Sequence, residues 1–111
     1  MRLGTRVPKP FPFSRRERRV PMEVGVQIAG NAALPGVETT FTENVSPRGA
    51  RVLSSRPWRL NDRLTLTTVT GAFQSIGRVA YCEPIRDTGF AVGVEFVECR
   101  GQWVLANTSA G

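Results

Sequence analysis

The sequence predicts an all-β domain built from six short antiparallel strands, arranged as a barrel or a sandwich. Its length of 111 residues suits one domain, because a single core usually organises about 100 to 200 residues. Several short runs alternate apolar and polar residues, as half-buried strands do. Gly, Pro, Asn and Ser cluster between these runs, and no internal run indicates a helix.

Residues 1–13 are predicted to be a flexible arm. Pro8, Pro10 and Pro12 remove backbone hydrogen-bond donors there and disfavour helix in the residues that precede them. A short basic segment follows the arm, and the folded domain is expected to extend over residues 14–99.

Six strands are expected within this domain. In the first, Val24, Val26 and Ile28 fall on one face, because successive side chains of a strand point to opposite sides. Turn-forming residues separate the later strands. The expected strands span residues 24–29, 39–45, 50–54, 63–69, 75–83 and 90–98.

Residues 100–111 are expected to form a C-terminal tail. Gly101, Asn107 and Thr108 are poor helix-forming residues. A C-terminal helix is therefore expected to be short or absent, and a single turn over residues 102–106 is left open.

The positive charge lies ahead of the first strand. The net charge is +6, and residues 1–20 hold seven basic side chains against one acidic one, which is the whole excess. Residues 21–111 hold eight of each sign. Fourteen of the basic residues are Arg and one is Lys, and a guanidinium can bind phosphate or a guanine edge through two parallel hydrogen bonds. This distribution indicates a local anion-binding site.

The composition argues against an enzyme or a metalloprotein. There is no His, which excludes Ser-His-Asp triads and most zinc sites, and Walker and G-x-S-x-G motifs are absent. A hairpin between the last two strands would separate Cys82 from Cys99 by roughly 26 Å, beyond disulfide reach. We expect two free thiols, no catalysis, no cofactor and no metal.

The sequence also favours a cytoplasmic protein without membrane insertion. No apolar run approaches the roughly 18 residues that a spanning helix needs, and residues 1–13 lack the apolar stretch of a signal peptide. Free thiols agree with a reducing compartment.

Two motifs depart from the strand pattern and resemble those of the PilZ domain family. The run RRERR at residues 15–19 precedes the first strand, and NVSPRG at residues 44–49 follows the second. The family has R-x-x-x-R and [D/N]-x-S-x-x-G at these places, and the resemblance covers about residues 14–99. The matching residues are Arg15, Arg19, Asn44, Ser46 and Gly49. Weaker similarities are GRV at residues 77–79 and GVEF at residues 93–96.

This resemblance implies a six-stranded antiparallel β-barrel that binds the bacterial second messenger cyclic di-GMP. Arg15, Arg16 and Arg19 belong to the site that the resemblance implies, and their side chains can bind phosphate oxygens or the guanine edge. Asn44 suits a base edge and Ser46 a phosphate, while Gly49 allows a close backbone approach. The candidate ligand-binding residues are Arg15, Arg16, Arg19, Asn44, Ser46 and Gly49.

Other positions refine this expectation. Asn44 stands where Asp is commoner in the family, which removes a negative charge from the expected site. Trp58 and Trp103 are expected to be core or barrel-plugging residues. Room for a flat ligand is expected over four small residues that should face outward, Gly25, Ala29, Ala91 and Gly93.

The resemblance implies a receptor without enzymatic activity. Ligand binding is expected to order the N-terminal arginine segment and so to change binding of an unidentified protein partner or of a second copy. An alternative is a small-barrel module that binds RNA or DNA through its basic arm. A long nucleic acid would bind with a steep dependence on salt, and a ligand with two phosphates with a shallow one. A PilZ interaction module that binds no nucleotide is a third interpretation.

Overall fold

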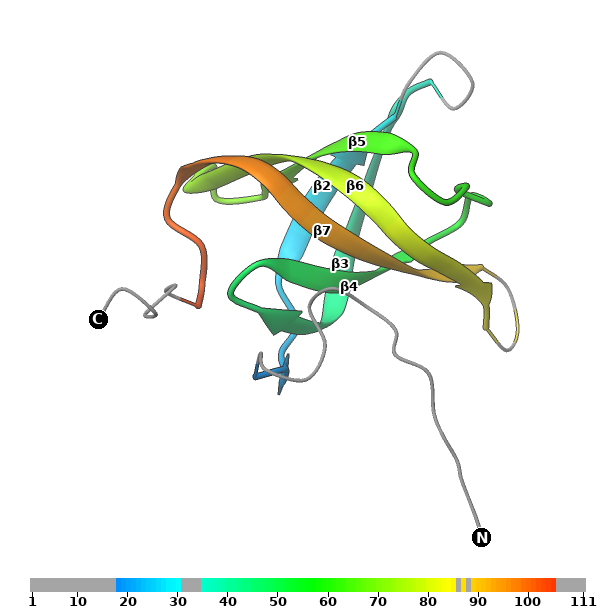
Figure 1. Ribbon diagram of the computed structural model, residues 1–111, viewed down its shortest axis with the longest axis horizontal. Helices are drawn as coiled ribbons and strands as arrows, with labels where there is room; N and C mark the ends of the chain where they lie inside the picture. Colours follow the sequence, from blue (N-terminus) through cyan, green and yellow to red (C-terminus); the bar gives the residue numbers. More distant parts are fainter. Residues whose placement is uncertain (1–17, 31–34, 86, 88, 106–111) are drawn as a thin grey trace, which may run out of the picture.

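The computed structural model describes residues 18–30, 35–85, 87 and 89–105, and within them all regular structure is β-strand (Figure 1). This confirms the predicted fold class. The six expected strands are β2 to β7, and β1 is a short additional strand. The strands are β1 (Val20–Pro21), β2 (Gly25–Ala29), β3 (Val37–Ser46), β4 (Gly49–Ser54), β5 (Arg63–Thr68), β6 (Phe73–Pro84) and β7 (Phe90–Gly101).

Strands β2 to β7 form a closed antiparallel barrel. The sheet order is β1-β3-β2-β5-β6-β7-β4, and an additional β3–β4 pairing closes the ring. Closure leaves these strands without long unpaired edges. Strands β1 and β2 both pair with the same edge of β3. Strand β2 pairs with its first half and β1 with its last residues.

The barrel interior is filled by the side chains that point inward from each strand, where inward and outward residues alternate. Val26 and Ile28 of β2 have no exposed surface, in agreement with the predicted apolar face. The other core members are mainly Val and Leu from every strand of the ring. Trp58 and Trp103 are both buried, which confirms them as core residues.

An aromatic cluster of Phe73, Phe96 and Trp103 forms part of the core and of its edge. Trp103 follows β7, and its ring centroid lies 4.8 Å from that of Phe73 and 4.9 Å from that of Phe96. The tail therefore contributes to the core without a helix as far as Leu105. Residues 106–111 lie outside the described part of the chain.

The β6–β7 pair explains the GRV and GVEF similarities. A Cβ at Gly77 would lie 2.7 Å from a methyl carbon of Val94, so the strands approach too closely there for a side chain. Arg78 is the cross-strand partner of Glu95, and its Nε donates to Glu95 Oε1 at 3.1 Å. These motif residues hold β6 and β7 together.

The two cysteines are free thiols, as predicted. Cys82 lies opposite Val92, one residue from the expected position, and Cys99 lies opposite Ser75. Partial burial disfavours the thiolate and raises the pKa of Cys82 above its ordinary value.

Candidate functional site

Strand β1 brings the two sequence motifs together. Val20 pairs with Val45, and Pro21 pairs with Asn44, so the chain enters the barrel alongside the second motif. Arg19 precedes β1 directly, and its Nη1 lies 3.5 Å from Oδ1 of Asn44. The structure therefore joins one residue of the R-x-x-x-R element to one of the [D/N]-x-S-x-x-G element.

A buried threonine fastens this entry segment to β3. Between β1 and β2, Oγ1 of Thr42 accepts a hydrogen bond from the Val24 amide at 2.9 Å and donates one to the Met22 carbonyl at 2.7 Å. The Met22 amide donates to the Glu43 carbonyl at 3.3 Å. Thr42 has no exposed surface, so its hydroxyl satisfies backbone groups where the regular ladder is interrupted.

A β-bulge turns Asn44 to the outer surface. The β3–β4 register shifts between Thr42 and Asn44, which inserts one additional residue into β3. Beyond the bulge, Val45 pairs with Ala50, and both are fully buried in the core. Because side chains alternate along a strand, Asn44 and its partner Arg51 point outward.

The second motif ends in a tight hairpin. Ser46 ends β3, Gly49 begins β4, and two residues form the turn between them. The Ser46 hydroxyl donates to the Gly49 carbonyl at 3.4 Å, and the Ser46 carbonyl accepts from Nε1 of Trp103 at 2.8 Å. Ser46 is fully buried and Gly49 is also buried, so their roles toward a ligand stay predictions.

A row of outward residues extends from Asn44 around the barrel. It crosses β3, β4, β7 and β6 in register through Asn44, Arg51, Gly93 and Tyr81. Paired residues of neighbouring strands lie on the same face of a sheet, so these four residues share the outer face of the barrel, with Gly93 itself buried. We call these four residues the outer row.

Arg51 of the outer row makes three side-chain hydrogen bonds. Its Nε donates to Glu43 at 2.7 Å, and its Nη1 donates to Glu83 at 2.8 Å and to the Tyr81 hydroxyl at 3.1 Å. Its guanidinium carbon also lies 5.7 Å from the centre of the Tyr81 ring, within cation–π range. Burial alone would lower the pKa of Arg51, but the hydrogen bonds to Glu43, Glu83 and Tyr81 outweigh it and raise this pKa above its ordinary value.

Motif matching alone missed the Arg51 contacts. Arg51 lies two residues after Gly49, on the outward face of the next strand. The available signal was strand alternation from the end of the motif. Tyr81 and Glu83 come from a distant strand, and only the β4–β7–β6 register places them beside Arg51.

The expectation of open space over the small residues of β7 is wrong. A Cβ at Gly93 would collide with the ring of Tyr81, so this ring already lies over the Gly93 backbone. Ala91 is fully buried. Gly25 is exposed, but the nearest methyl carbon of Val69 lies 3.2 Å from where a Cβ would be.

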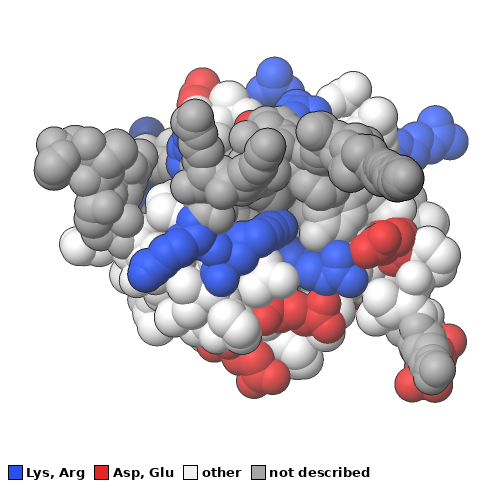
Figure 2. Space-filling view, turned by 60° about the horizontal axis from the view of Figure 1, so that its bottom comes forward, with Lys and Arg blue, Asp and Glu red and all other residues white. Residues whose placement is uncertain are grey.

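Basic groups gather at the end of the barrel that carries β1. This end is in the lower part of Figure 1 and comes forward in Figure 2, where basic groups form a row above several acidic ones. The single lysine, Lys9, lies outside the described residues, so the blue groups are arginines. Arg18 and Arg48 are exposed. Arg15 and Arg16 also lie outside the described residues, and their roles stay predictions.

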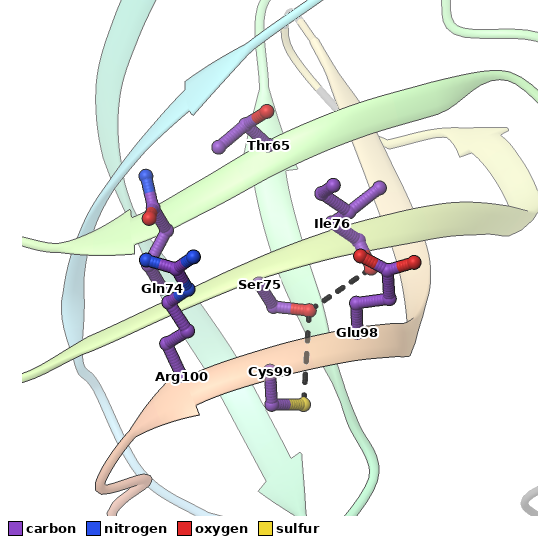
Figure 3. A pocket seen from close by; sticks show the side chains of 7 residues that line it. All are labelled: Thr65, Gln74, Ser75, Ile76, Glu98, Cys99 and Arg100. Carbon is purple, nitrogen blue, oxygen red and sulfur yellow. Dashed lines mark hydrogen bonds between the residues drawn. The ribbon is translucent and has the colours of Figure 1, made fainter.

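A shallow pocket of about 320 Å³ lies on another part of the barrel surface (Figure 3). Ser75 and Cys99 lie between flanking side chains of β6 and β7, with Gln74 and Arg100 on one side and Ile76 and Glu98 on the other. Its lining residues are Thr65, Gln74, Ser75, Ile76, Glu98, Cys99 and Arg100, and it includes no residue of the two motifs.

The described residues hold no group of three or more His, Cys, Asp or Glu that could bind a metal ion. They also contain no helix long and apolar enough to cross a membrane.

Comparison with known proteins agrees with the motif assignment. No curated protein matches the chain. The PilZ domain model matches residues 13–102, which is most of the chain and includes β1 to β7 and both motifs. The chain therefore belongs to the PilZ domain family, a family of cyclic di-GMP receptors.

Proposed function

We propose that this protein is a cyclic di-GMP receptor whose ligand binds where β1 meets the β3–β4 hairpin. The observation that carries the proposal is the contact of Arg19 with Asn44. It brings the two motifs, which are separated in sequence, to one place on the barrel surface. Arg15 and Arg16, four and three residues ahead of Arg19 in the chain, complete the proposed site.

The chemistry of these residues suits the ligand. Cyclic di-GMP carries two phosphates and two guanines, and arginine binds phosphate oxygens or the guanine O6 and N7 edge with paired N–H donors. Asn44 adds an amide with both donor and acceptor atoms. Its side chain is partly exposed next to Arg19, where a ligand can contact both residues.

The protein acts by binding and not by catalysis. The arginine segment before β1 closes over the ligand and becomes ordered, and this change alters the surface offered to a protein partner or to a second copy. Binding then carries an ordering cost, and the same ordering serves as the signal. Free thiols at Cys82 and Cys99 support a reducing location such as the cytoplasm.

Calorimetric titration of the full chain with cyclic di-GMP tests this function. We expect saturable binding at a fixed stoichiometry, with a shallow dependence of affinity on salt because only two phosphates are contacted. A single-stranded RNA of mixed sequence is the comparison ligand. No heat with cyclic di-GMP, or tight RNA binding with a steep salt dependence, would overturn the proposal.

A further inference from the structure

We propose that Glu43 and Glu83, joined through Arg51, form a base-recognition cluster that selects guanine over adenine in the cyclic dinucleotide. The inference rests on the proposed function and assigns a role to residues outside both motifs. We call Glu43, Arg51 and Glu83 the acid–arginine cluster.

The cluster lies beside the proposed ligand site. Arg51 is the cross-strand partner of Asn44 in the outer row, and Glu43 precedes Asn44 in the bulge. Glu83 comes from the end of β6, yet its Oε2 lies 2.8 Å from Nη1 of Arg51. A ligand that contacts Asn44 therefore has all three charged groups within reach of one of its bases.

The charge of the cluster argues against a phosphate subsite. One guanidinium is matched by two carboxylates, at 2.7 Å and 2.8 Å, so the cluster carries one net negative charge. A phosphate placed there would meet Coulomb repulsion. Carboxylates instead accept hydrogen bonds from N–H and O–H donors. This ligand has such donors on its bases and on its ribose 2′-hydroxyls, and only the base donors differ between guanine and adenine.

The donor and acceptor order of the cluster matches guanine. The Watson–Crick edge of guanine presents the O6 acceptor beside N1–H and N2–H donors, whereas adenine presents an N6–H donor beside the N1 acceptor. A guanidinium N–H next to a carboxylate oxygen complements guanine, because the N–H can donate to O6 while the carboxylate oxygen accepts from N1–H. With adenine, the same carboxylate oxygen would face N1, so that two acceptors oppose each other. Arg51 engages one oxygen of each carboxylate, and each carboxylate has a second acceptor oxygen.

The cluster is accessible and held in place. The side chains of Glu43 and Glu83 are 42% and 53% exposed, whereas Arg51 between them is 25% exposed. Tyr81 holds Arg51 through its hydroxyl at 3.1 Å. A base can thus reach the acids, while the arginine that orients them has little freedom to move.

The test is the ratio of the affinities for cyclic di-GMP and cyclic di-AMP, measured for the full chain and for the double variant Glu43→Gln/Glu83→Gln. The two ligands carry the same phosphates, so the loss of negative charge near the site changes both affinities equally and cancels in the ratio. We expect the preference for cyclic di-GMP to fall by about tenfold or more, as for the loss of one specific base contact.

A matched control is Glu98→Gln, which removes an exposed carboxylate from the pocket of Figure 3. It should leave the ratio unchanged. If the double variant does not fold, the single variant Glu83→Gln replaces it, because Glu83 is exposed near the end of β6. An unchanged ratio with cyclic di-GMP still bound overturns this inference alone. Absence of cyclic di-GMP binding to the unmodified chain overturns the proposed function, and this inference with it.

Discussion

At the residue scale, two arginines beside Asn44 differ in what surrounds them. Arg51 is held by two carboxylates and a tyrosine hydroxyl, and these contacts raise its pKa. Arg19 contacts the neutral amide of Asn44. Arg19 lies where the chain enters β1 beside Asn44, so we expect a ligand phosphate to contact Arg19, whereas the two carboxylates on Arg51 would repel a phosphate there.

Replacement of Arg19 by alanine should therefore reduce cyclic di-GMP affinity while the melting temperature stays nearly constant. A hydrogen bond to a charged group contributes about 1.5 to 3 kcal/mol, so we expect a loss of about one to two orders of magnitude in affinity. Arg19 precedes β1 and lies outside the core, so unfolding should change little. Calorimetry and thermal denaturation measure the two effects.

The matched control is Arg63→Ala. Arg63 is an exposed arginine, whereas Arg19 is half-buried, and it lies on β5, across the ring from β4. It should bind cyclic di-GMP as the unmodified chain does. Equal losses in both variants would mean that general charge, and not the position of Arg19, drives binding.

At the element scale, the site depends on how β1 and β3 are joined. Thr42 bridges the interruption between β1 and β2 with two hydrogen bonds. The adjacent bulge orients Asn44. Loss of this joint should affect both the stability of the barrel and the placement of Arg19.

Replacement of Thr42 by valine should lower the free energy of unfolding by about 1 to 3 kcal/mol, because it removes the hydrogen-bond partner of two partly buried backbone groups, the Val24 amide and the Met22 carbonyl. Cyclic di-GMP affinity should fall as well, since Arg19 enters the site from the loosened segment. Urea denaturation and calorimetry measure these changes. Thr67→Val, on the outer face of β5, is the control. An unfolding free energy equal to that of the unmodified chain would contradict the proposed role of Thr42.

A second element-scale prediction concerns the start of the β6–β7 ladder. Gly101 has a φ of 86°, and an added Cβ would collide with the Ala72 carbonyl oxygen. Gly71 has nearly the same φ, 84°, but nothing lies within 4 Å of its Cβ position. Gly101→Ala should therefore destabilise the protein by about 1 to 3 kcal/mol more than Gly71→Ala. Equal losses in chemical denaturation would show that backbone conformation alone sets the cost.

At the scale of the whole molecule, a neutral barrel follows a strongly basic N-terminal segment. Residues 21–111 contain equal numbers of acidic and basic side chains, and the excess of six positive charges lies in residues 1–20. The proposed site is where this segment enters the barrel. A dianionic ligand would neutralise part of the charge and link the segment to the β3–β4 hairpin.

Residues 13–19 should accordingly gain protection from amide hydrogen exchange when cyclic di-GMP binds. Ligand contacts to Arg15 and Arg19 would order a segment whose charges repel one another in the free protein. Exchange is measured with and without ligand, and strand β2, which is paired on both sides within the barrel, serves as an internal reference that should not change. Equal protection of residues 13–19 in both states would exclude the proposed switch but not the binding site.

Much of the barrel could be predicted from the sequence because strand alternation is a local property. The pattern of Val26 and Ile28 in β2 identifies the buried face without knowledge of any neighbour. The absence of histidine and the separation of the cysteines likewise depend only on composition and spacing. The two motifs were sufficient to indicate the family, which the match over residues 13–102 confirms.

The tertiary structure alone decided which residues surround the motifs. The sequence does not reveal β1, since two residues carry no periodic pattern, nor the bulge that directs Asn44 outward. Arg51 and Glu83 become neighbours only through the register of β4, β7 and β6, and a slip of one residue would turn either side chain to the opposite face. Pairing register joins distant parts of the chain, and for that physical reason local pattern predicted the strands but not the composition of the site.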